Sequence, residues 1–304
     1  MTAKDARALH YARRRAWALF LGFALFVTIV AAVDASTNDR FETKTTGPTL
    51  AQAGINAALP TLKAREDALK REIALRRREN VAIKDVLGYT SYITTGTPNA
   101  KEVALTFDDG PSEYTPQVIK ILDREKVPAT FFEVGSSIRT YPDVTRELIE
   151  KGYAVANHTE THPRMGDLDA GTQAREIDRT SQAFEAFGIP RPKLWRPPFG
   201  SFNATTLALL KKRNMLMVMW DVDTNDYAQP GTISITQRVL QDAKPGSIVL
   251  MHDGGGGRSQ TVEALPEIIK GLRANGFTLV SVPQLLLDDP PPRDQPLPRR
   301  LDGG

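Results

Sequence analysis

Short apolar runs alternate with helical patterns through the middle of the chain, and this alternation constrains the fold more than any other feature. Seven runs have the composition of strands: residues 103–107, 130–134, 153–156, 193–195, 216–221, 248–251 and 277–280. Strands separated by helices pair in parallel, because each helix returns the chain to the same end of the sheet. The sequence therefore predicts an α/β fold with a seven-stranded parallel sheet or barrel.

Side chains that can do acid–base or metal chemistry come directly after these predicted strands. They are Asp108, Asp109, His158, Arg196, Asp226 and His252. Parallel strands share one carboxyl edge, and the active sites of such folds lie at that edge. The sequence therefore predicts that the six side chains converge on one site.

Two short motifs have the residue types of a hydrolytic metal site. Residues 106–111 (TFDDGP) contain adjacent carboxylates, Asp108 and Asp109, so that one can bind a metal while the other accepts a proton. His158 and His162 are four positions apart, a spacing that puts both imidazoles on one face of a helical turn. One carboxylate and two imidazoles leave a coordination position open for water. Either motif alone is more typical of a turn or of surface histidines, but together they predict a metal-dependent hydrolase.

Composition limits the ligands and partners. Cysteine is absent, so oxygen and nitrogen must hold any metal. The net charge is +3, but the basic residues gather at the chain ends and in residues 61–86. That segment has helical spacing of apolar residues, and Glu66, Glu72 and Glu79 interrupt its basic residues, which is typical of a solvated face. We expect a stalk helix within a linker of residues 34–98, with a weak coiled-coil dimer left open, and no nucleic-acid partner.

Both ends of the chain have a character of their own. Residues 16–33 form an uncharged stretch of 18 residues, long enough to cross the roughly 30 Å hydrocarbon core of a bilayer. An arginine triplet precedes it, so the positive-inside rule places residues 1–15 in the cytoplasm and the remainder outside. A cleaved signal peptide is the alternative. Residues 288–304 are rich in proline and are expected to form a disordered tail.

Three further segments complete a recognisable pattern. They are RPPFG at residues 196–200, WDVDTNDY at residues 220–227 and LMHD at residues 250–253. Together with TFDDGP and the HTETH segment, in this order, they closely resemble the polysaccharide deacetylases of carbohydrate esterase family four, the NodB homology domain. The resemblance covers about residues 99–287. It implies a distorted seven-stranded (β/α) barrel, a bound divalent metal that is usually zinc, and removal of N- or O-acetyl groups from a glycan.

The resemblance also implies a catalytic role for each matching residue. Asp109, His158 and His162 match the metal triad of the family. Asp108 matches the general base, and Arg196 matches the residue that orients this base and balances its charge. A nearby cation keeps a carboxylate ionised, which suits that role.

The remaining matches concern proton delivery and the substrate. His252 matches the general acid that protonates the departing amine, and Asp226 matches the residue that tunes its pKa. The residues that match the substrate pocket are Phe199, Trp220, Tyr227 and Leu250. The backbone N–H of Phe199 is expected to hold the developing oxyanion, and Leu250 to floor the acetyl pocket. Tyr227 departs from the family pattern, because many members have tryptophan there.

The sequence as a whole predicts a zinc-dependent deacetylase of an N-acetylglucosamine-containing polysaccharide outside the cytoplasm. The substrate is peptidoglycan or an exopolysaccharide, and a single N-terminal span holds the protein in the bacterial inner membrane. An O-acetyl esterase of the same fold and a non-catalytic glycan-binding or scaffold protein stay open as alternatives. The glycine run at residues 254–257 is expected to form a mobile loop, with no lysine after it to make a phosphate-binding loop.

Overall fold

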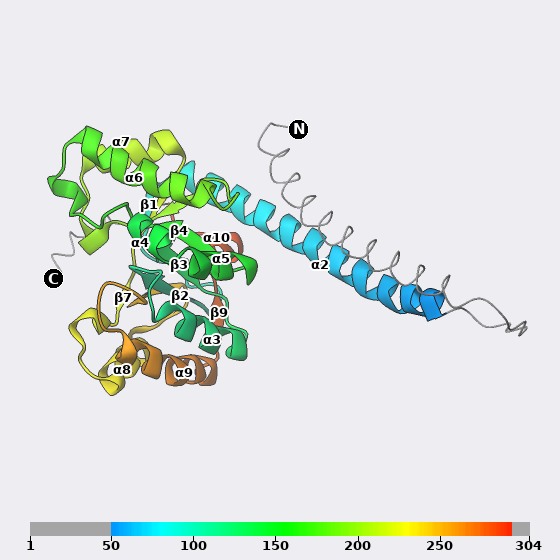
Figure 1. Cartoon of the computed structure of the whole chain (residues 1–304). Coiled ribbons are helices and arrows are strands. Elements are labelled where there is room, and N and C mark those ends of the chain that lie inside the picture. Colours follow the sequence, from blue (N-terminus) through cyan, green and yellow to red (C-terminus); the bar gives the residue numbers. More distant parts are fainter. Residues whose placement is uncertain (1–49, 294–304) are drawn as a thin grey trace, which may run out of the picture. The chain divides into compact units, whose positions relative to one another are not determined.

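The structure is a computed structural model, and it describes residues 50–293 of the chain (Figure 1). The chain divides into two compact units between Arg77 and Arg78, inside helix α2 (Leu50–Leu87). The predicted cytoplasmic segment and membrane span lie outside the described residues. Between residues 50 and 293, no helix combines the length and the apolar character that crossing a bilayer requires.

Helix α2 covers the segment in which the stalk is predicted. Exposed ion pairs one turn apart, Lys70 with Glu66 and Arg76 with Glu72, lie along it, as the interleaved charges indicate. The helix itself is present. Its role as a stalk and the weak dimer are not tested by the structure and stay predictions.

Nine parallel strands form one sheet in the second unit. They are β1 (Tyr92–Ile93), β2 (Glu102–Asp108), β3 (Thr130–Glu133), β4 (Ala154–Asn157), β5 (Leu194–Trp195), β6 (Leu216–Val218), β7 (Val222–Asp223), β8 (Ser247–His252) and β9 (Thr278–Val280). The strand order is β1-β6-β5-β4-β3-β2-β8-β7, and β9 pairs with the first half of β2. Strand β2 is therefore central, with β8 along one edge and β3 and β9 along the other.

All seven predicted strands are present, but the expected seven-stranded barrel needs correction. The strands form a half-barrel that ends at β1 and β7, which are not neighbours in the sheet that the described residues form. Strands β1 and β7 have two residues each, too few to show an apolar alternation in the sequence. The predicted strand at residues 216–221 ends early, at Val218, and the chain then turns into β7.

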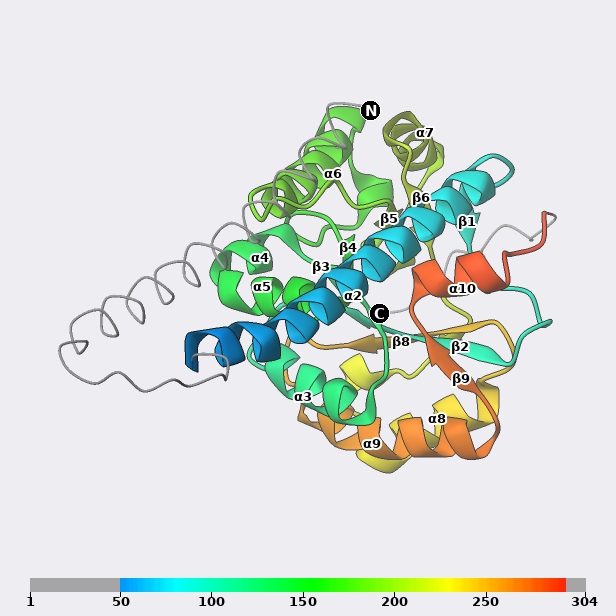
Figure 2. The same ribbon diagram turned by 90° about the vertical axis from the view of Figure 1, so that its right-hand side faces the viewer.

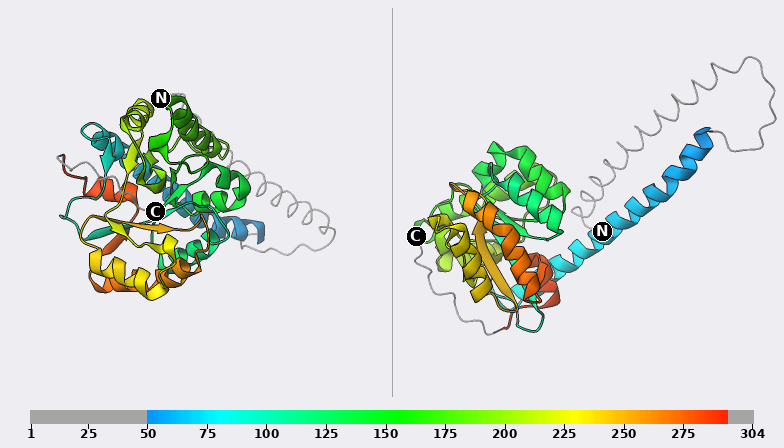
Figure 3. Two further views of the ribbon diagram at one scale, coloured as in Figure 1. Left: turned by 90° about the vertical axis from the view of Figure 1, so that its left-hand side faces the viewer. Right: turned by 90° about the horizontal axis from the view of Figure 1, so that it is seen from below.

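Seven helices of the second unit cover the outer face of the sheet: α3 (Thr115–Glu125), α4 (Gly135–Thr140), α5 (Pro142–Glu150), α6 (Ala170–Glu185), α7 (Ala204–Arg213), α8 (Thr232–Asp242) and α9 (Ser259–Ala274). Helix α10 (Val282–Asp288) packs on the opposite face, in one apolar cluster with Ala104. Short 3-10 turns lie at η1 (Met165–Asp167), η2 (Pro198–Gly200) and η3 (Asp226–Ala228). Helices α8 and α9 lie side by side in every view (Figures 1 and 3). Phe107 stacks on Phe131 at 5.2 Å within the apolar core that these helices share with the sheet.

Alternation along β2 sends its side chains to two different cores. Val103, Leu105 and Phe107 belong to the core beneath α3, α8 and α9, whereas Ala104 packs on the other face. Because successive side chains of a strand point to opposite faces, Asp108 shares the face of Ala104. This register brings the last residue of β2 into the concave side of the half-barrel.

The chain after α10 remains packed on the domain past the predicted boundary at residue 287. Asp289 is buried, and its carboxylate accepts hydrogen bonds from the Asn99 side chain (3.3 Å) and the Ala100 N–H (3.1 Å). The Tyr89 hydroxyl donates to the carbonyl of Pro291 (2.7 Å). Figure 2 shows α10 beside the last turns of α2, where both contribute to one apolar cluster. The rest of the predicted tail lies outside the described residues.

Candidate active site

The carboxyl end of β2 brings two adjacent aspartates into one cavity. Asp108 is the last residue of the strand and is almost fully buried. Asp109 follows with a left-handed backbone (φ 71°), so the strand's alternation ends there. His158 Nε2 lies 3.7 Å from Asp108 Oδ2 and 3.4 Å from Asp109 Oδ1, so one imidazole approaches both carboxylates.

Among the described residues, one cluster has metal-ligand geometry: Asp109, His158 and His162. One ligand atom from each lies within 4.8 Å of the others. Asp109 Oδ1 is 3.4 Å from His158 Nε2 and 3.0 Å from His162 Nε2, yet it is buried and has no partner with hydrogen-bond geometry in the described part of the chain. A buried oxygen that two imidazole nitrogens approach without bonding is what a shared cation would satisfy.

The protonation of this cluster also suits a cation. His158 Nδ1 lies 3.0 Å from the Arg196 carbonyl oxygen, which can only accept, so Nδ1 donates there and Nε2 is the nitrogen that faces Asp109. Burial alone would raise the pKa of Asp109, but the two imidazoles beside it hold that pKa well below its usual range. The three residues therefore fit a divalent metal.

The segment that carries the two histidines is not helical, and the expected helical turn is wrong. Thr159 and His162 have left-handed backbones (φ 67° and 59°), and the segment is an irregular loop. Asn157 Oδ1 accepts from the Thr159 N–H (2.9 Å), and Thr159 Oγ1 accepts from the His162 N–H (3.2 Å). These local hydrogen bonds compete with a helical turn and bring the imidazole rings to 5.0 Å.

Arg196 lies fully buried beneath the cluster and holds Asp108. Its Nη1 donates to Asp108 Oδ1 (2.7 Å) and to Thr106 Oγ1 (2.8 Å). Its Nε and Nη2 donate to the backbone carbonyls of Val218 and Met219 (3.1 Å each). Burial lowers the pKa of Arg196, and the Asp108 carboxylate opposes that shift. The guanidinium is fixed at four points and cannot leave its partner.

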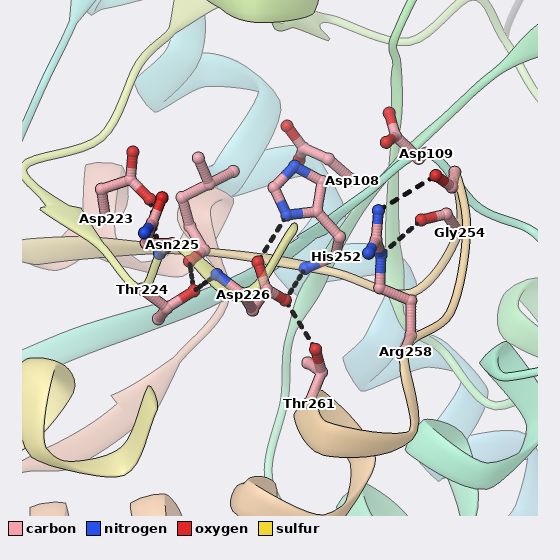
Figure 4. Close-up of polar contacts among 12 residues, drawn as sticks. Asp108, Asp109, Asp223, Thr224, Asn225, Asp226, His252, Gly254, Arg258 and Thr261 are labelled. Carbon is pink, nitrogen blue, oxygen red and sulfur yellow. Dashed lines mark hydrogen bonds and ion pairs between the residues drawn. The ribbon is translucent and has the colours of Figure 1, made fainter. Parts of the chain in front are cut away.

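His252, the last residue of β8, is held by Asp226 (Figure 4). Its Nδ1 donates to Asp226 Oδ1 (2.7 Å), while Asp226 Oδ2 accepts from the His252 N–H (2.8 Å) and the Thr261 hydroxyl (2.7 Å). Burial would lower the pKa of His252, but the charge and hydrogen bond of Asp226, helped by Asp109 and Asp108, raise it to about 9. His252 is therefore a protonated imidazole beside a carboxylate.

One cavity of about 470 Å³ collects nearly all the residues predicted for the site. Those that line it are Asp108, Asp109, His158, His162, Phe199, Trp220, Tyr227, Leu250 and His252. Arg196 and Asp226 do not line the cavity, because they lie behind the side chains that they hold. The Phe199 ring is 4.5 Å from the His162 ring, and the Tyr227 ring meets that of His252 edge-on at 5.5 Å. A larger groove of about 640 Å³ beside α4, α5 and α6 contains none of the predicted residues.

Sequence reasoning missed the role of the loop before α9. Arg258 donates to the carbonyls of Gly254 (2.7 Å), Gly257 (3.0 Å) and Gly255 (3.1 Å), and so closes the loop around a buried guanidinium. A Cβ on Gly254 would lie 2.2 Å from the Asp109 carbonyl oxygen, and one on Gly255 would lie 2.3 Å from Asp109 Oδ2. The glycines therefore let this loop approach Asp109 closely. Arg258 itself, directly after the glycine run, is the signal that could have indicated this.

The fold and the site define an α/β half-barrel whose concave side holds a candidate metal cluster and two acid–base pairs. The chain matches the profile of the family described as "Polysaccharide deacetylase" over residues 95–218. It is 38% identical over 201 residues to a peptidoglycan-N-acetylglucosamine deacetylase of Bacillus cereus, which covers 65% of this chain and 94% of the relative. It is 38% identical over 197 residues to a chitooligosaccharide deacetylase of Rhizobium leguminosarum bv. trifolii, which covers 60% of this chain and 91% of the relative.

A solved structure agrees with these sequence matches. The crystal structure of the peptidoglycan N-acetylglucosamine deacetylase Bc1960 superposes with a TM-score of 0.63 at 32% identity, covering 66% of this chain and 95% of that one. The chain belongs to the polysaccharide deacetylase family, carbohydrate esterase family four, and is a hydrolase. The family prediction made from the five motifs is confirmed.

Proposed function

We propose that this protein is a divalent-metal-dependent deacetylase that hydrolyses N-acetyl groups of a polysaccharide containing N-acetylglucosamine. The observation that supports this most is that Asp109, His158 and His162 share one pocket with Asp108 and His252, a candidate base and a candidate acid. Peptidoglycan and chitooligosaccharides are the first substrates to consider, because two relatives are named for acting on them.

Asp109, His158 and His162 would hold the metal, and their oxygen and nitrogen donors suit Zn²⁺. When bound there, a divalent metal polarises the acetyl carbonyl and lowers the pKa of water beside it. Asp109 Oδ1, which is buried without a hydrogen-bond partner among the described residues, supports this assignment.

Asp108 is placed to take one proton from the attacking water, while the remaining hydroxyl bonds to the acetyl carbon. The hydrogen bond from Arg196 Nη1 (2.7 Å) fixes the orientation of the Asp108 carboxylate at the pocket. We assign to the backbone N–H of Phe199 the role of stabilising the negative charge that develops on the acetyl oxygen. A donor of this kind stabilises the transition state by about 2.7–4 kcal/mol in other hydrolases.

His252 then donates its proton to the amide nitrogen as the carbon–nitrogen bond breaks. The sugar leaves as an amine, and acetate is the second product. Asp226 keeps His252 protonated and oriented for this step. An alkoxide leaving from an ester depends less on such an acid, so an O-acetyl esterase would tolerate loss of His252 better.

The test is acetate release by the zinc-loaded protein from chitooligosaccharides, peptidoglycan and acetylated xylan, with Asp108→Asn as the control. We expect the protein to release acetate from the N-acetyl glycans and Asp108→Asn to release none. Release from acetylated xylan alone would assign an O-acetyl esterase. A protein that binds no zinc and releases no acetate would revive the scaffold alternative.

Variants separate the metal from the acid. Asp109→Ala and His158→Ala are expected to lose bound zinc, as measured by metal analysis after gel filtration. His252→Ala is expected to keep zinc and to lose most amide hydrolysis. Full activity of His252→Ala on an N-acetyl glycan would show that the assigned acid is wrong.

The position of the enzyme in the cell is a separate part of the proposal. Residues 16–33, preceded by an arginine triplet, would anchor the chain in the bacterial inner membrane with the catalytic unit outside the cytoplasm. A reporter fused after Gly304 that is active only outside the cytoplasm is the expected result. A reporter active in the cytoplasm would refute this placement.

A further inference from the structure

The backbone of the loop from His158 to His162 is not fixed by its local hydrogen bonds alone. Two of its residues, Thr159 and His162, adopt left-handed conformations that side-chain-bearing residues rarely populate. Such conformations persist only where the surroundings impose them. Asn157 Oδ1 and Thr159 Oγ1 accept from the N–H groups of Thr159 and His162, and the first N–H groups of α4 donate to the carbonyls of Thr159 (2.9 Å) and Glu160 (3.0 Å). The N–H groups of Glu160 and Thr161 take part in none of these contacts.

Glu176 supplies the missing support from helix α6. Its Oε2 accepts from the backbone N–H groups of Glu160 (2.9 Å) and Thr161 (2.8 Å), and its Oε1 accepts from the Thr161 hydroxyl (2.9 Å). One carboxylate thus receives three hydrogen bonds from the two consecutive residues between Thr159 and His162. Hydrogen bonds to an ionised acceptor are shorter and stronger than neutral ones, so this contact is well suited to fixing a backbone.

Helix α6 is itself a rigid support. The Asp169 side chain caps its N-terminus by accepting from the N–H groups of Gly171 and Thr172. Next to Glu176, the helix receives the Asn157 side chain at the Ile177 carbonyl (2.9 Å) and, about one turn further on, at Ser181 Oγ (3.1 Å). The segment that leads to the histidines is therefore docked on α6 at two places, before the loop and in its middle.

We propose that Glu176 is a positioning residue for the metal site: it holds the loop in the conformation that aims His158 and His162 at Asp109. Glu176 does not line the cavity, and its three hydrogen bonds go to Glu160 and Thr161 rather than to the proposed ligands. It acts through the backbone of the residues between them. This inference rests on the proposed function, because it assumes that the three residues bind a metal.

The inference is tested by measuring the Zn²⁺ dissociation constant of the full chain by competition with a chelator. Glu176→Ala removes all three hydrogen bonds and is expected to weaken zinc binding roughly 10- to 100-fold, as loss of outer hydrogen-bond partners does in other metal sites. Glu176→Gln is expected to restore most of the affinity, because its amide oxygen can accept both backbone N–H groups. Glu185→Ala is the matched control: Glu185 lies on the same helix and pairs with Arg191 at the surface.

Three outcomes decide the matter. A positioning role is supported if Glu176→Ala binds zinc more weakly and recovers its activity at excess zinc. The melting temperature of its metal-free form should then be near that of Glu185→Ala. Wild-type zinc affinity in Glu176→Ala overturns it. A large fall in the melting temperature, with Glu176→Gln no better, overturns it as well, because the residue would then serve the fold rather than the loop. Should the wild-type chain bind no zinc, the proposed function fails instead.

Discussion

Arg196 Nη1 lies 2.7 Å from Asp108 Oδ1, and both side chains are almost completely shielded from solvent. The guanidinium also lies 4.0 Å from the centre of the Phe132 ring, so a cation and an aromatic face add to the ion pair. A charge pair that is buried this deeply loses much hydration. It is stable only while both partners are present.

Replacing Arg196 should therefore destabilise the catalytic unit as well as stop the reaction. Arg196→Met leaves Asp108 buried without its cation, and we expect a loss of about 3–5 kcal/mol in the free energy of unfolding. Deacetylase activity should fall at least 100-fold. Chemical denaturation and acetate release measure the two effects, and Arg191→Met, which removes a half-exposed arginine, is the control with a change under about 1 kcal/mol. Equal stability of the two variants would contradict this reading of the pair.

The glycine run before α9 should tolerate side chains unequally. At Gly255 (φ 72°), a Cβ would lie 2.3 Å from Asp109 Oδ2, so Gly255→Ala should displace this proposed metal ligand. At Gly257, the nearest atom is the end of the flexible Gln229 side chain at 3.3 Å. We expect Gly255→Ala to weaken zinc binding at least tenfold and Gly257→Ala to leave it within about twofold, because an outer-shell disturbance of a ligand costs 10- to 100-fold. Chelator competition measures the zinc affinity of both variants. Equal zinc affinities would show that the loop shifts to accept the new Cβ without moving Asp109.

How far the sequence could predict this site depends on whether a contact is encoded locally. Asp108 and His252 end strands with clear apolar patterns and Asp109 directly follows one, so their convergence follows from parallel pairing of β2 and β8. The pairs of Asp108 with Arg196 and of Asp226 with His252 join distant segments, and only the resemblance to the family indicated them. Spacing alone gave the wrong conformation for the histidine loop.

Local sequence patterns could not predict the conformation of the histidine loop or the contacts that support it. A helical turn and the observed loop both bring His158 and His162 together, so periodicity could not distinguish them. The hydrogen bonds from Glu160 and Thr161 to Glu176 span 16 and 15 residues, and the approach of Gly255 to Asp109 joins the segments that follow two different strands. Such contacts depend on the assembled sheet and helices, which no short window of sequence contains.

Tyr227 should affect binding of the glycan more than the chemical step. Its ring lines the cavity and is 36% exposed, which leaves a face free for a sugar. Tyr227→Ala is expected to raise KM about 2- to 10-fold with a smaller change in kcat, since an aromatic contact contributes about 0.5–1.5 kcal/mol. Tyr141→Ala, at a similarly exposed tyrosine outside the cavity, is the control. A fall in kcat at constant KM would instead place Tyr227 in the chemical step.

The pair of His252 and Asp226 should set the alkaline limit of the reaction. The proposed acid must be protonated, so kcat/KM falls as the pH rises through the pKa of His252, which Asp226, Asp109 and Asp108 raise to about 9. A divalent metal on Asp109 offsets part of that negative charge, so the loaded enzyme should reach its limit somewhat below this value. In Asp226→Asn the strongest source of the upward shift is gone, and the decline should begin about one to three pH units lower. The measurement is the pH profile of acetate release at constant zinc, with the exposed Asp167→Asn as the control, and an unchanged alkaline limb in Asp226→Asn would mean that His252 is not the group that titrates.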